Sequence, residues 1–223
     1  MALFIGGVLM SAVYVVMISG QKSSAGVERK VAAQQDVRAA LEIMAMEISM
    51  ASYNPFFELG MWFQNDCITV GNPANRGIQE ATPTSITVEM DIGENGSIGG
   101  SDQNEVIRYF YDAANQYITR STNCGTAQPF LGAASGAATG TRTVTVMNSS
   151  AGINNGAGNA AVFRYYDSNG TELYPDATPA NIPNIRRVDI TLAVQTEEKD
   201  PSTNQYRQMI YSTGVLARNH GLN

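Results

Sequence analysis

The chain opens with an apolar run, residues 1–20, in which no side chain is charged. A helix rises about 1.5 Å per residue, so roughly twenty residues span about 30 Å, the thickness of the hydrocarbon core of a bilayer. The run therefore predicts a helix that lies in a membrane or in a bundle of like helices. Its large apolar residues are the expected membrane or filament contacts: Leu3, Phe4, Ile5, Val8, Leu9, Val13, Val16 and Ile18.

The alternatives for this run are a cleaved signal peptide and a buried core helix. A signal peptide has a shorter apolar region, which ends at a small-residue cleavage site in extended chain. Gln21 and Lys22 instead continue the helical register beyond the apolar run. This continuity favours the membrane or bundle helix.

After residue 20 the apolar positions recur three or four residues apart, and charged residues occupy the opposite side. This spacing is typical of an amphipathic helix. We therefore expect residues 21–52 to continue the first helix, and we expect Pro55 to stop it because a residue before proline avoids the helical region. The expected contacts between this helix and a globular head are Val27, Val31, Leu41, Met44 and Ile48.

Residues 53–223 form the expected head, in which apolar and polar residues alternate as in half-buried strands. The alternation is clearest over residues 86–92 and 187–194, and two further pairs of strands flank turns at 113–115 and 168–170. Short polar turns between such segments predict hairpins. The whole pattern predicts an α+β fold, in which a long N-terminal helix, half transmembrane and half amphipathic, packs on an antiparallel β-sheet head.

Large apolar residues also gather just after the helix, at Phe56, Phe57, Met61, Trp62 and Phe63. Aromatic residues in such clusters usually belong to a core. We therefore expect the cluster to fold back on the helix. The alternative is an exposed adhesive patch at the tip of the head.

Several segments carry information beyond their periodicity: MALFIGGVLMSAVYVV, VRAALEIMAMEISMASYNP, EVIRYFYDAANQYITR, FRYYDSNGTELY, IRRVDITLAVQTEEKDPSTNQYR and VLARN. They resemble the minor pilins of the PilW kind, within the type IV pilin and pseudopilin superfamily. The resemblance extends over most of the chain and implies a pilin-like stalk and head.

The resemblance implies a structural subunit, a minor pilin that helps to initiate or cap a type IV pilus. It implies storage in the bacterial inner membrane with a periplasmic head, and later assembly into an extracellular pilus. The implied partners are other pilin subunits through the N-terminal helix, the inner membrane and the pilus assembly machinery. The alternatives are a type II secretion pseudopilin of the J kind and a pilus-tip adhesin.

The family's leader-peptidase signature is a glycine, then a phenylalanine, with a glutamate a few residues later, and by the resemblance it would lie just before Met1. Lys22, Arg29 and Lys30 follow the apolar run, and no charged side chain precedes it. By the positive-inside rule, this arrangement taken by itself places the head in the cytoplasm. A short cationic leader, as the family has, reverses this balance. We therefore expect a periplasmic head.

The net charge of the chain is -6. Acidic and basic residues balance over residues 1–55, so the negative charge belongs to the head. An acidic head repels phosphate backbones, and we expect no nucleic-acid partner.

Cys67 and Cys124 are the only cysteines. An even count in a chain placed outside the cytoplasm suggests one disulfide. Closing a loop of this length would stabilise the head by roughly 4 kcal/mol on the chain-entropy model. The alternative is two free thiols.

Residues suited to catalysis or metal binding are sparse. Asp91, Asn95 and Asp102 match part of a calcium loop, but Gly93 stands at the third position, and a turn of glycine and asparagine explains the same residues. The one histidine, His220, is expected at a frayed C-terminus, and the sequence holds no G-x-S-x-G, H-E-x-x-H or C-x-x-C motif. We therefore expect neither enzyme activity nor a cofactor.

Overall fold

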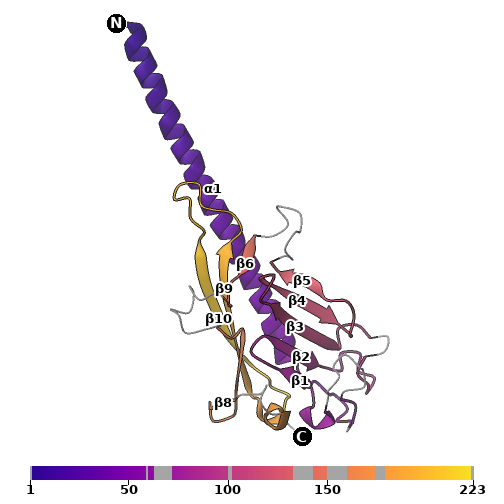
Figure 1. Cartoon of the computed structure of the whole chain (residues 1–223). Coiled ribbons are helices and arrows are strands. Elements are labelled where there is room, and N and C mark those ends of the chain that lie inside the picture. The colour runs from indigo at the N-terminus through magenta and orange to yellow at the C-terminus, as the bar shows by residue number, and fades with distance from the viewer. Residues whose placement is uncertain are drawn as a thin grey trace.

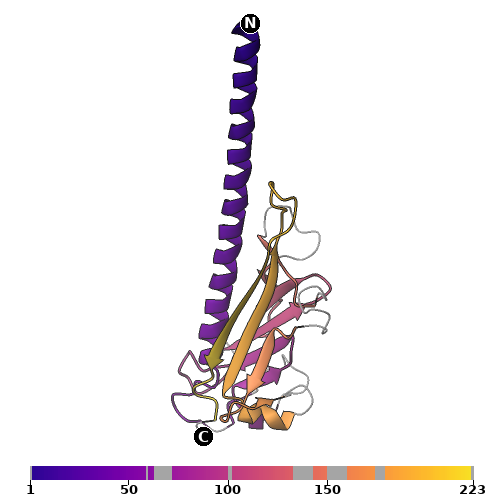
Figure 2. The same ribbon diagram turned by 90° about the vertical axis from the view of Figure 1, so that its left-hand side faces the viewer.

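The computed structural model describes residues 2–58, 60–62, 72–99, 102–132, 143–149, 160–173 and 179–221. In these ranges one long helix, α1 (Ala2–Ser49), leads into a head built on two antiparallel sheets. Figure 1 shows α1 projecting from the head toward the N-terminus, and Figure 2 shows the strands alongside its lower half. The predicted α+β class, with a long N-terminal helix and antiparallel strands, is confirmed.

The first sheet has the strand order β1-β2-β3-β4-β5, and each neighbouring pair is antiparallel. The hairpin predicted around residues 113–115 is confirmed as β3 and β4. The strands are β1 (Ile78–Ala81), β2 (Ser85–Glu89), β3 (Val106–Asp112), β4 (Tyr117–Thr122) and β5 (Gln128–Leu131).

The second sheet has the order β10-β9-β7-β8, and β6 also pairs with β9. The hairpin predicted around residues 168–170 is confirmed as β7 and β8. The strands are β6 (Val144–Val146), β7 (Phe163–Tyr166), β8 (Glu172–Leu173), β9 (Arg187–Thr196) and β10 (Gln208–Leu216). Short helices η1 (Pro73–Asn75) and η2 (Pro179–Asn184) complete the described elements.

The expectation of a single sheet in the head is wrong. Helix α1 contacts β9 and β10 of the second sheet and also β5 of the first. Buried residues of α1 and of both sheets belong to one hydrophobic core. One sheet covers only one side of a helix, whereas two sheets enclose its buried stripe.

The buried stripe of α1 follows the helical period. Leu41, Met44 and Ile48, which the sequence assigns to the head contact, are all buried in the core. Small residues complete the stripe and let strands approach the helix closely. The whole stripe is Ala33, Val37, Ala40, Leu41, Met44 and Ile48.

Val27 and Val31 were assigned to the same contact, and this assignment is wrong. Their exposed fractions are 59% and 42%. The head instead meets this part of the helix at Gly26, where an added Cβ would lie 3.3 Å from the carboxylate of Asp200. The contacted face is therefore displaced around the helix from the two valines.

The end of α1 also differs from the expected boundary at residue 52. The helix ends at Ser49, and Ser52 has a φ of 65°. The amide of Ser52 donates to the carbonyl oxygen of Glu89 at 2.9 Å. This bond to β2 takes the place of a helical bond and directs the chain into the head.

Strand β2 is buried on both faces, not on one as its alternation predicts. Ile86 and Val88 lie in the core, and Thr87 and Glu89 are buried on the opposite face. Buried polar groups need hydrogen-bond partners, and Gln79 of β1 supplies one by donating to Glu89 at 3.0 Å. Side chains of the neighbouring strand β1 thus satisfy the polar groups of β2.

The aromatic cluster after the helix divides into two parts. Met61 and Trp62 are buried as expected, but in a second, smaller cluster with Ile98 and Val106, which includes no residue of α1. Phe56 and Phe57 are 56% and 68% exposed, so the expectation of core positions is wrong for them. Phe63 lies outside the described residues.

His220 is 1% exposed, so the expectation of a frayed C-terminus is also wrong. After β10 the chain is held by the amide of Ala217, which donates to the carbonyl oxygen of Arg186 at 3.0 Å. The C-terminal turn then brings the histidine ring beneath the end of α1, against Ser52.

Candidate functional site

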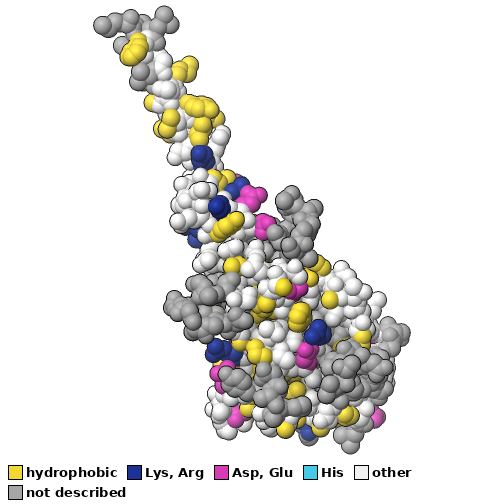
Figure 3. Space-filling view, viewed as in Figure 1, with side chains coloured by type: hydrophobic (Ala, Val, Ile, Leu, Met, Phe, Trp, Pro, Cys, Tyr) yellow, Lys and Arg dark blue, Asp and Glu magenta, His cyan; other side chains and the backbone are white. Residues whose placement is uncertain are grey.

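The upper part of α1 is a stalk that exposes large apolar side chains. Residues 13–17 are consecutive and each is more than 60% exposed, so the apolar surface surrounds the helix and does not form a stripe. Figure 3 shows hydrophobic side chains along the stalk above the head. The exposed set is Phe4, Leu9, Met10, Val13, Tyr14, Val15, Val16 and Met17.

The remaining predicted stalk contacts are less informative. Ile18 is half-buried. The side chains of Leu3, Ile5 and Val8 lie outside the described residues. Among the residues that the structure describes, no helix combines the length and the apolar character that crossing a membrane requires.

An ion pair joins the stalk to the head where the two first meet. Arg29 pairs with Glu198, in the turn between β9 and β10, at 2.5 Å, and its guanidinium donates to the carbonyl oxygen of Lys199 at 2.9 Å. The two charged side chains are 40% and 64% exposed. Exposed pairs of this kind contribute about 1 kcal/mol or less, so the contact orients the turn more than it stabilises the fold.

The turn that carries Glu198 is itself held by Asp200. Its carboxylate accepts from the hydroxyl of Ser202 at 2.5 Å and from Arg207 at 2.6 Å. The Ser202 hydroxyl, followed by the Arg207 guanidinium, holds the pKa of Asp200 well below its usual range. The carboxylate therefore stays charged, and the turn keeps its shape near neutral pH.

A second ion pair joins α1 to the head near the C-terminal end of the helix, and its side chains are more buried than those of the first pair. Glu47 accepts from Arg120 of β4 at 2.6 Å and also accepts the hydroxyl hydrogen of Tyr109. The side chains of Arg120 and Glu47 are 24% and 12% exposed. Burial, with the Glu47 carboxylate beside it, raises the pKa of Tyr109, so the phenol stays protonated as a donor.

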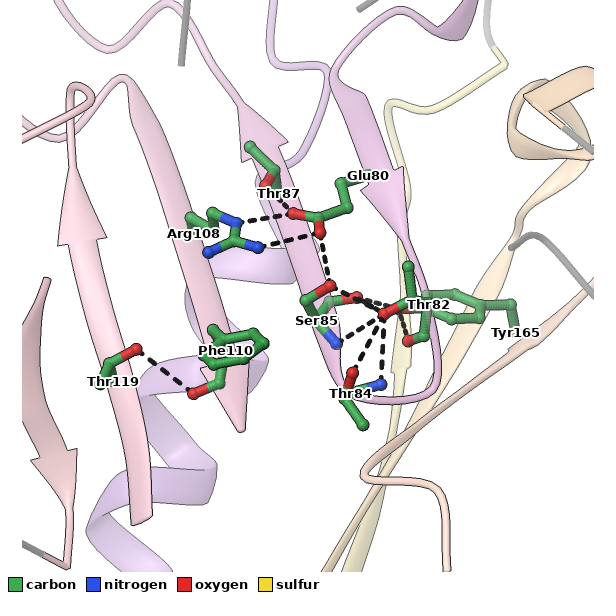
Figure 4. Close-up of polar contacts among 9 residues, drawn as sticks. All are labelled: Glu80, Thr82, Thr84, Ser85, Thr87, Arg108, Phe110, Thr119 and Tyr165. Atoms are coloured by element: carbon green, nitrogen blue, oxygen red, sulfur yellow. Dashed lines mark hydrogen bonds and ion pairs between the residues drawn. The ribbon is translucent and has the colours of Figure 1, made fainter. Parts of the chain in front are cut away.

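A polar network on the first sheet fixes the strands that carry this ion pair. Figure 4 shows Arg108 of β3 reaching Glu80 of β1, with the hydroxyls of Ser85 and Thr87 on the same carboxylate. Arg108 donates to Glu80 at 2.7 and 3.0 Å. Burial alone would raise the pKa of Glu80, but Arg108 and the hydroxyls outweigh it and hold that pKa below its usual value.

The same network reaches the second sheet through Tyr165. Its hydroxyl lies 2.9 Å from the carbonyl oxygens of Thr82 and Ser85, to which it donates. Figure 4 shows the Tyr165 ring approaching the β1–β2 turn from β7. The two sheets are therefore joined by hydrogen bonds as well as by the core.

The structure brings the predicted calcium residues together, and their oxygen atoms accept hydrogen bonds from within the loop. Asp91 accepts the amides of Asn95 and Gly96 at 3.1 and 3.0 Å. The side chain of Asn95 donates to Asp102, and Glu105 accepts two more backbone amides. These bonds build a loop. No cluster of three or more His, Cys, Asp or Glu that could hold a metal ion is found in the described ranges.

The predicted disulfide involves one residue that lies outside the described residues, Cys67. Cys124 follows β4 and has a φ of 60°. No free cysteine is found within the described ranges. The pairing of the two cysteines stays a prediction.

Comparisons with known proteins found no matching family model, no matching curated protein and no matching solved structure. The resemblance to minor pilins therefore depends on the sequence segments quoted above.

Sequence reasoning missed the ion pairs between the stalk and the head, including their two residues on α1, Arg29 and Glu47. The helical pattern places both on the polar side of α1, facing water. Glu47 follows the buried Met44 by one helical turn, and this spacing was the only local sign that it faces the head. Arg29 offered no such sign because its partner, Glu198, lies far away in the sequence.

Proposed function

We propose that this chain is a minor pilin, a structural subunit that helps to initiate or cap a type IV pilus. The observation that carries the proposal is the stalk, whose large apolar side chains are exposed around the whole helix and away from the head. A helix that is apolar on all sides needs apolar surroundings. Lipid supplies such surroundings before assembly, and like helices supply them in a filament.

The stalk also has the small residues that close helix packing requires. A Cβ added at Gly6, Gly7 or Gly20 would meet no atom within 4 Å, so these positions are open to a neighbouring helix. Moving such a helix from lipid into a bundle exchanges one apolar surrounding for another. Packing at small residues then favours the bundle.

The head suits a subunit that must hold its stalk in a fixed direction. Arg29 with Glu198 and Glu47 with Arg120 tie α1 to the head at two levels. The proposed partners are other pilin subunits, the inner membrane and the pilus assembly machinery. We place the head in the periplasm before assembly and at the cell surface afterwards.

A matched pair of substitutions tests the role of the stalk. Val13→Asp puts a charge on the stalk, and Ile210→Asp puts the same charge on β10; the two native side chains are 66% and 61% exposed. A carboxylate at the centre of a membrane helix costs about 2.5 to 3.5 kcal/mol. We expect Val13→Asp to deplete the protein from both membranes and sheared filaments, and Ile210→Asp to leave it in both fractions.

The proposal fails if the unaltered protein is found in neither fraction, or if Val13→Asp leaves its distribution unchanged. Deleting the gene separates the pilus from the related secretion filament. Loss of pili supports the minor pilin. Loss of protein secretion with normal pili assigns the same stalk to a pseudopilin.

A further inference from the structure

The outer face of the second sheet carries a hollow of about 380 Å³ that the stalk does not use. It lies over β7, β9 and β10. Figure 2 shows the long strands β9 and β10 beside the helix. Most of the residues that line it are polar. The lining residues that matter for ligand binding are those that form hydrogen bonds or set the shape of the hollow: Arg164, Tyr166, Asp189, Thr191, Ser212 and Gly214.

Strand register brings these groups onto one face. Asp189 of β9 lies opposite Arg164 of β7 on one side and opposite Gly214 of β10 on the other. Thr191 and Ser212 form the next outward pair. Because side chains of paired residues point to the same face of a sheet, one row offers a guanidinium and a carboxylate, and the next row offers two hydroxyls.

Gly214 keeps the floor of the hollow open. A Cβ at this position would lie 3.0 Å from Oδ1 of Asp189. The absence of a side chain therefore leaves the carboxylate accessible, and Asp189 is 33% exposed. Arg164 is 52% exposed and its ion pair, with Glu172, is long at 3.9 Å.

The charges around the hollow balance. Arg187 pairs with Asp189 at 3.0 Å and its guanidinium lies 4.1 Å from the centre of the Tyr166 ring. With Arg164 and Glu172, the rim holds two cations and two carboxylates. A balanced rim gives little net attraction to a free ion such as phosphate, whereas the alternating donors and acceptors match a neutral ligand rich in hydroxyl groups.

We propose that this hollow binds a sugar ring of a neutral glycan. Asp189 accepts from two neighbouring sugar hydroxyls, Arg164 donates to a sugar oxygen, and Thr191 and Ser212 both donate and accept. The hollow is open and has no free aromatic face, because Arg187 covers the Tyr166 ring. We therefore expect millimolar affinity for the site. This inference does not depend on the role of the stalk.

The test uses the full chain in phospholipid nanodiscs, because sugar-based detergents would compete for the hollow. Saturation-transfer NMR is recorded with maltose, cellobiose, lactose and chitobiose as separate probes. We expect transfer to at least one disaccharide. Gly214→Val fills the floor and is expected to abolish it, while Gly20→Ala, on the exposed stalk, leaves it unchanged.

Two less disruptive substitutions test the hollow in case Gly214→Val prevents folding. Asp189→Asn preserves side-chain size, and Arg164→Gln keeps a polar side chain while removing the positive charge. Each is expected to weaken binding by at least about tenfold because a charge-assisted hydrogen bond is lost. Thermal unfolding confirms that each variant is folded. The proposal is overturned if none of the disaccharides receives saturation, if folded variants bind as the unaltered chain does, or if inorganic phosphate displaces the sugar.

Discussion

The hydroxyl of Ser52, just beyond the end of α1, donates to Nδ1 of His220, close to the C-terminus, at 2.8 Å. Nε2 of the same ring lies 2.8 Å from the carbonyl oxygen of Ile182 and donates to it. Ser52 in turn accepts from the amide of Gly77 at 3.1 Å. With the ring neutral, Nδ1 accepts from Ser52. A charged ring would have to donate from Nδ1 to the Ser52 oxygen, which already accepts from Gly77.

The buried histidine predicts that acid destabilises the head. Burial, assisted by Arg186 and Arg76, lowers the pKa of His220 to about 4, against the bond to Ile182. In the unfolded chain that pKa is about 6.5. The unfolded state therefore binds a proton first, so the stabilisation is complete above about pH 6.5 and is lost as the pH falls toward 4.

Denaturant unfolding in detergent measures this effect. Between about pH 7.5 and about pH 5 we expect the free energy of unfolding to fall by about 2 kcal/mol through His220. His220→Gln keeps polar atoms in the site without a titration in this range, and it should remove most of that fall. Equal pH dependence in the two proteins would show that the histidine is not the titrating group.

Gly77 is expected to tolerate no side chain. A Cβ at this position would lie 2.2 Å from the amide nitrogen of Ser52 and 2.6 Å from the carbonyl oxygen of Glu89. Both are backbone atoms, and they form the hydrogen bond that joins the chain after α1 to β2. Neither can move aside without breaking that bond. We expect Gly77→Ala to cost about 3 kcal/mol in unfolding free energy.

The control for this substitution is Gly20→Ala, where an added Cβ meets no atom within 4 Å. Alanine favours the helix over glycine by about 1 kcal/mol. We therefore expect the control to be neutral or slightly stabilising. A similar small effect at both glycines would contradict the close approach of Gly77 to Ser52.

The elements that sequence predicted correctly are those set by short-range pattern. The long helix and the hairpins at residues 113–115 and 168–170 follow from local periodicity and turn residues. The apolar stalk is also predictable from sequence, because a long run of uncharged residues in one helix can be recognised without knowing which distant residues it contacts. Local pattern therefore predicted the element types and the apolar stalk, but not the ion pairs that join the stalk to the head.

The features that local sequence did not show depend on partners far along the chain. Ala33 is buried and Val27 is exposed, although valine is the more apolar, because close approach of the second sheet selects small residues. His220 is buried because Ser52 and Ile182 complete its bonds. No window of local sequence contains these pairs.

The two ion pairs of α1 are expected to differ in strength. Arg120→Met leaves the carboxylate of Glu47, which is 12% exposed, without its guanidinium. We expect a loss of roughly 3 kcal/mol, since a buried charge loses its partner. Arg29→Met removes a pair in which Glu198 is 64% exposed, and about 1 kcal/mol or less should be lost.

Chemical unfolding of the two methionine variants compares these losses directly. Both replacements keep an unbranched side chain and remove one positive charge. The difference between the two losses of unfolding free energy therefore reports how buried each ion pair is. If both variants lose a similar, small amount of unfolding free energy, the carboxylate of Glu47 is solvated. The Glu47–Arg120 pair would then not fix the direction of the stalk.

The position of the head on α1 is tested by two truncations on the helix. Met44 is fully buried, whereas Val27 is 59% exposed. Met44→Ala leaves a cavity and should cost about 3 kcal/mol, while Val27→Ala should change the unfolding free energy by less than about 0.5 kcal/mol. If Val27→Ala costs as much as Met44→Ala, the head packs on the face that the apolar pattern alone predicts. The displacement of the contact around the helix, which Gly26 and Asp200 define, would then be wrong.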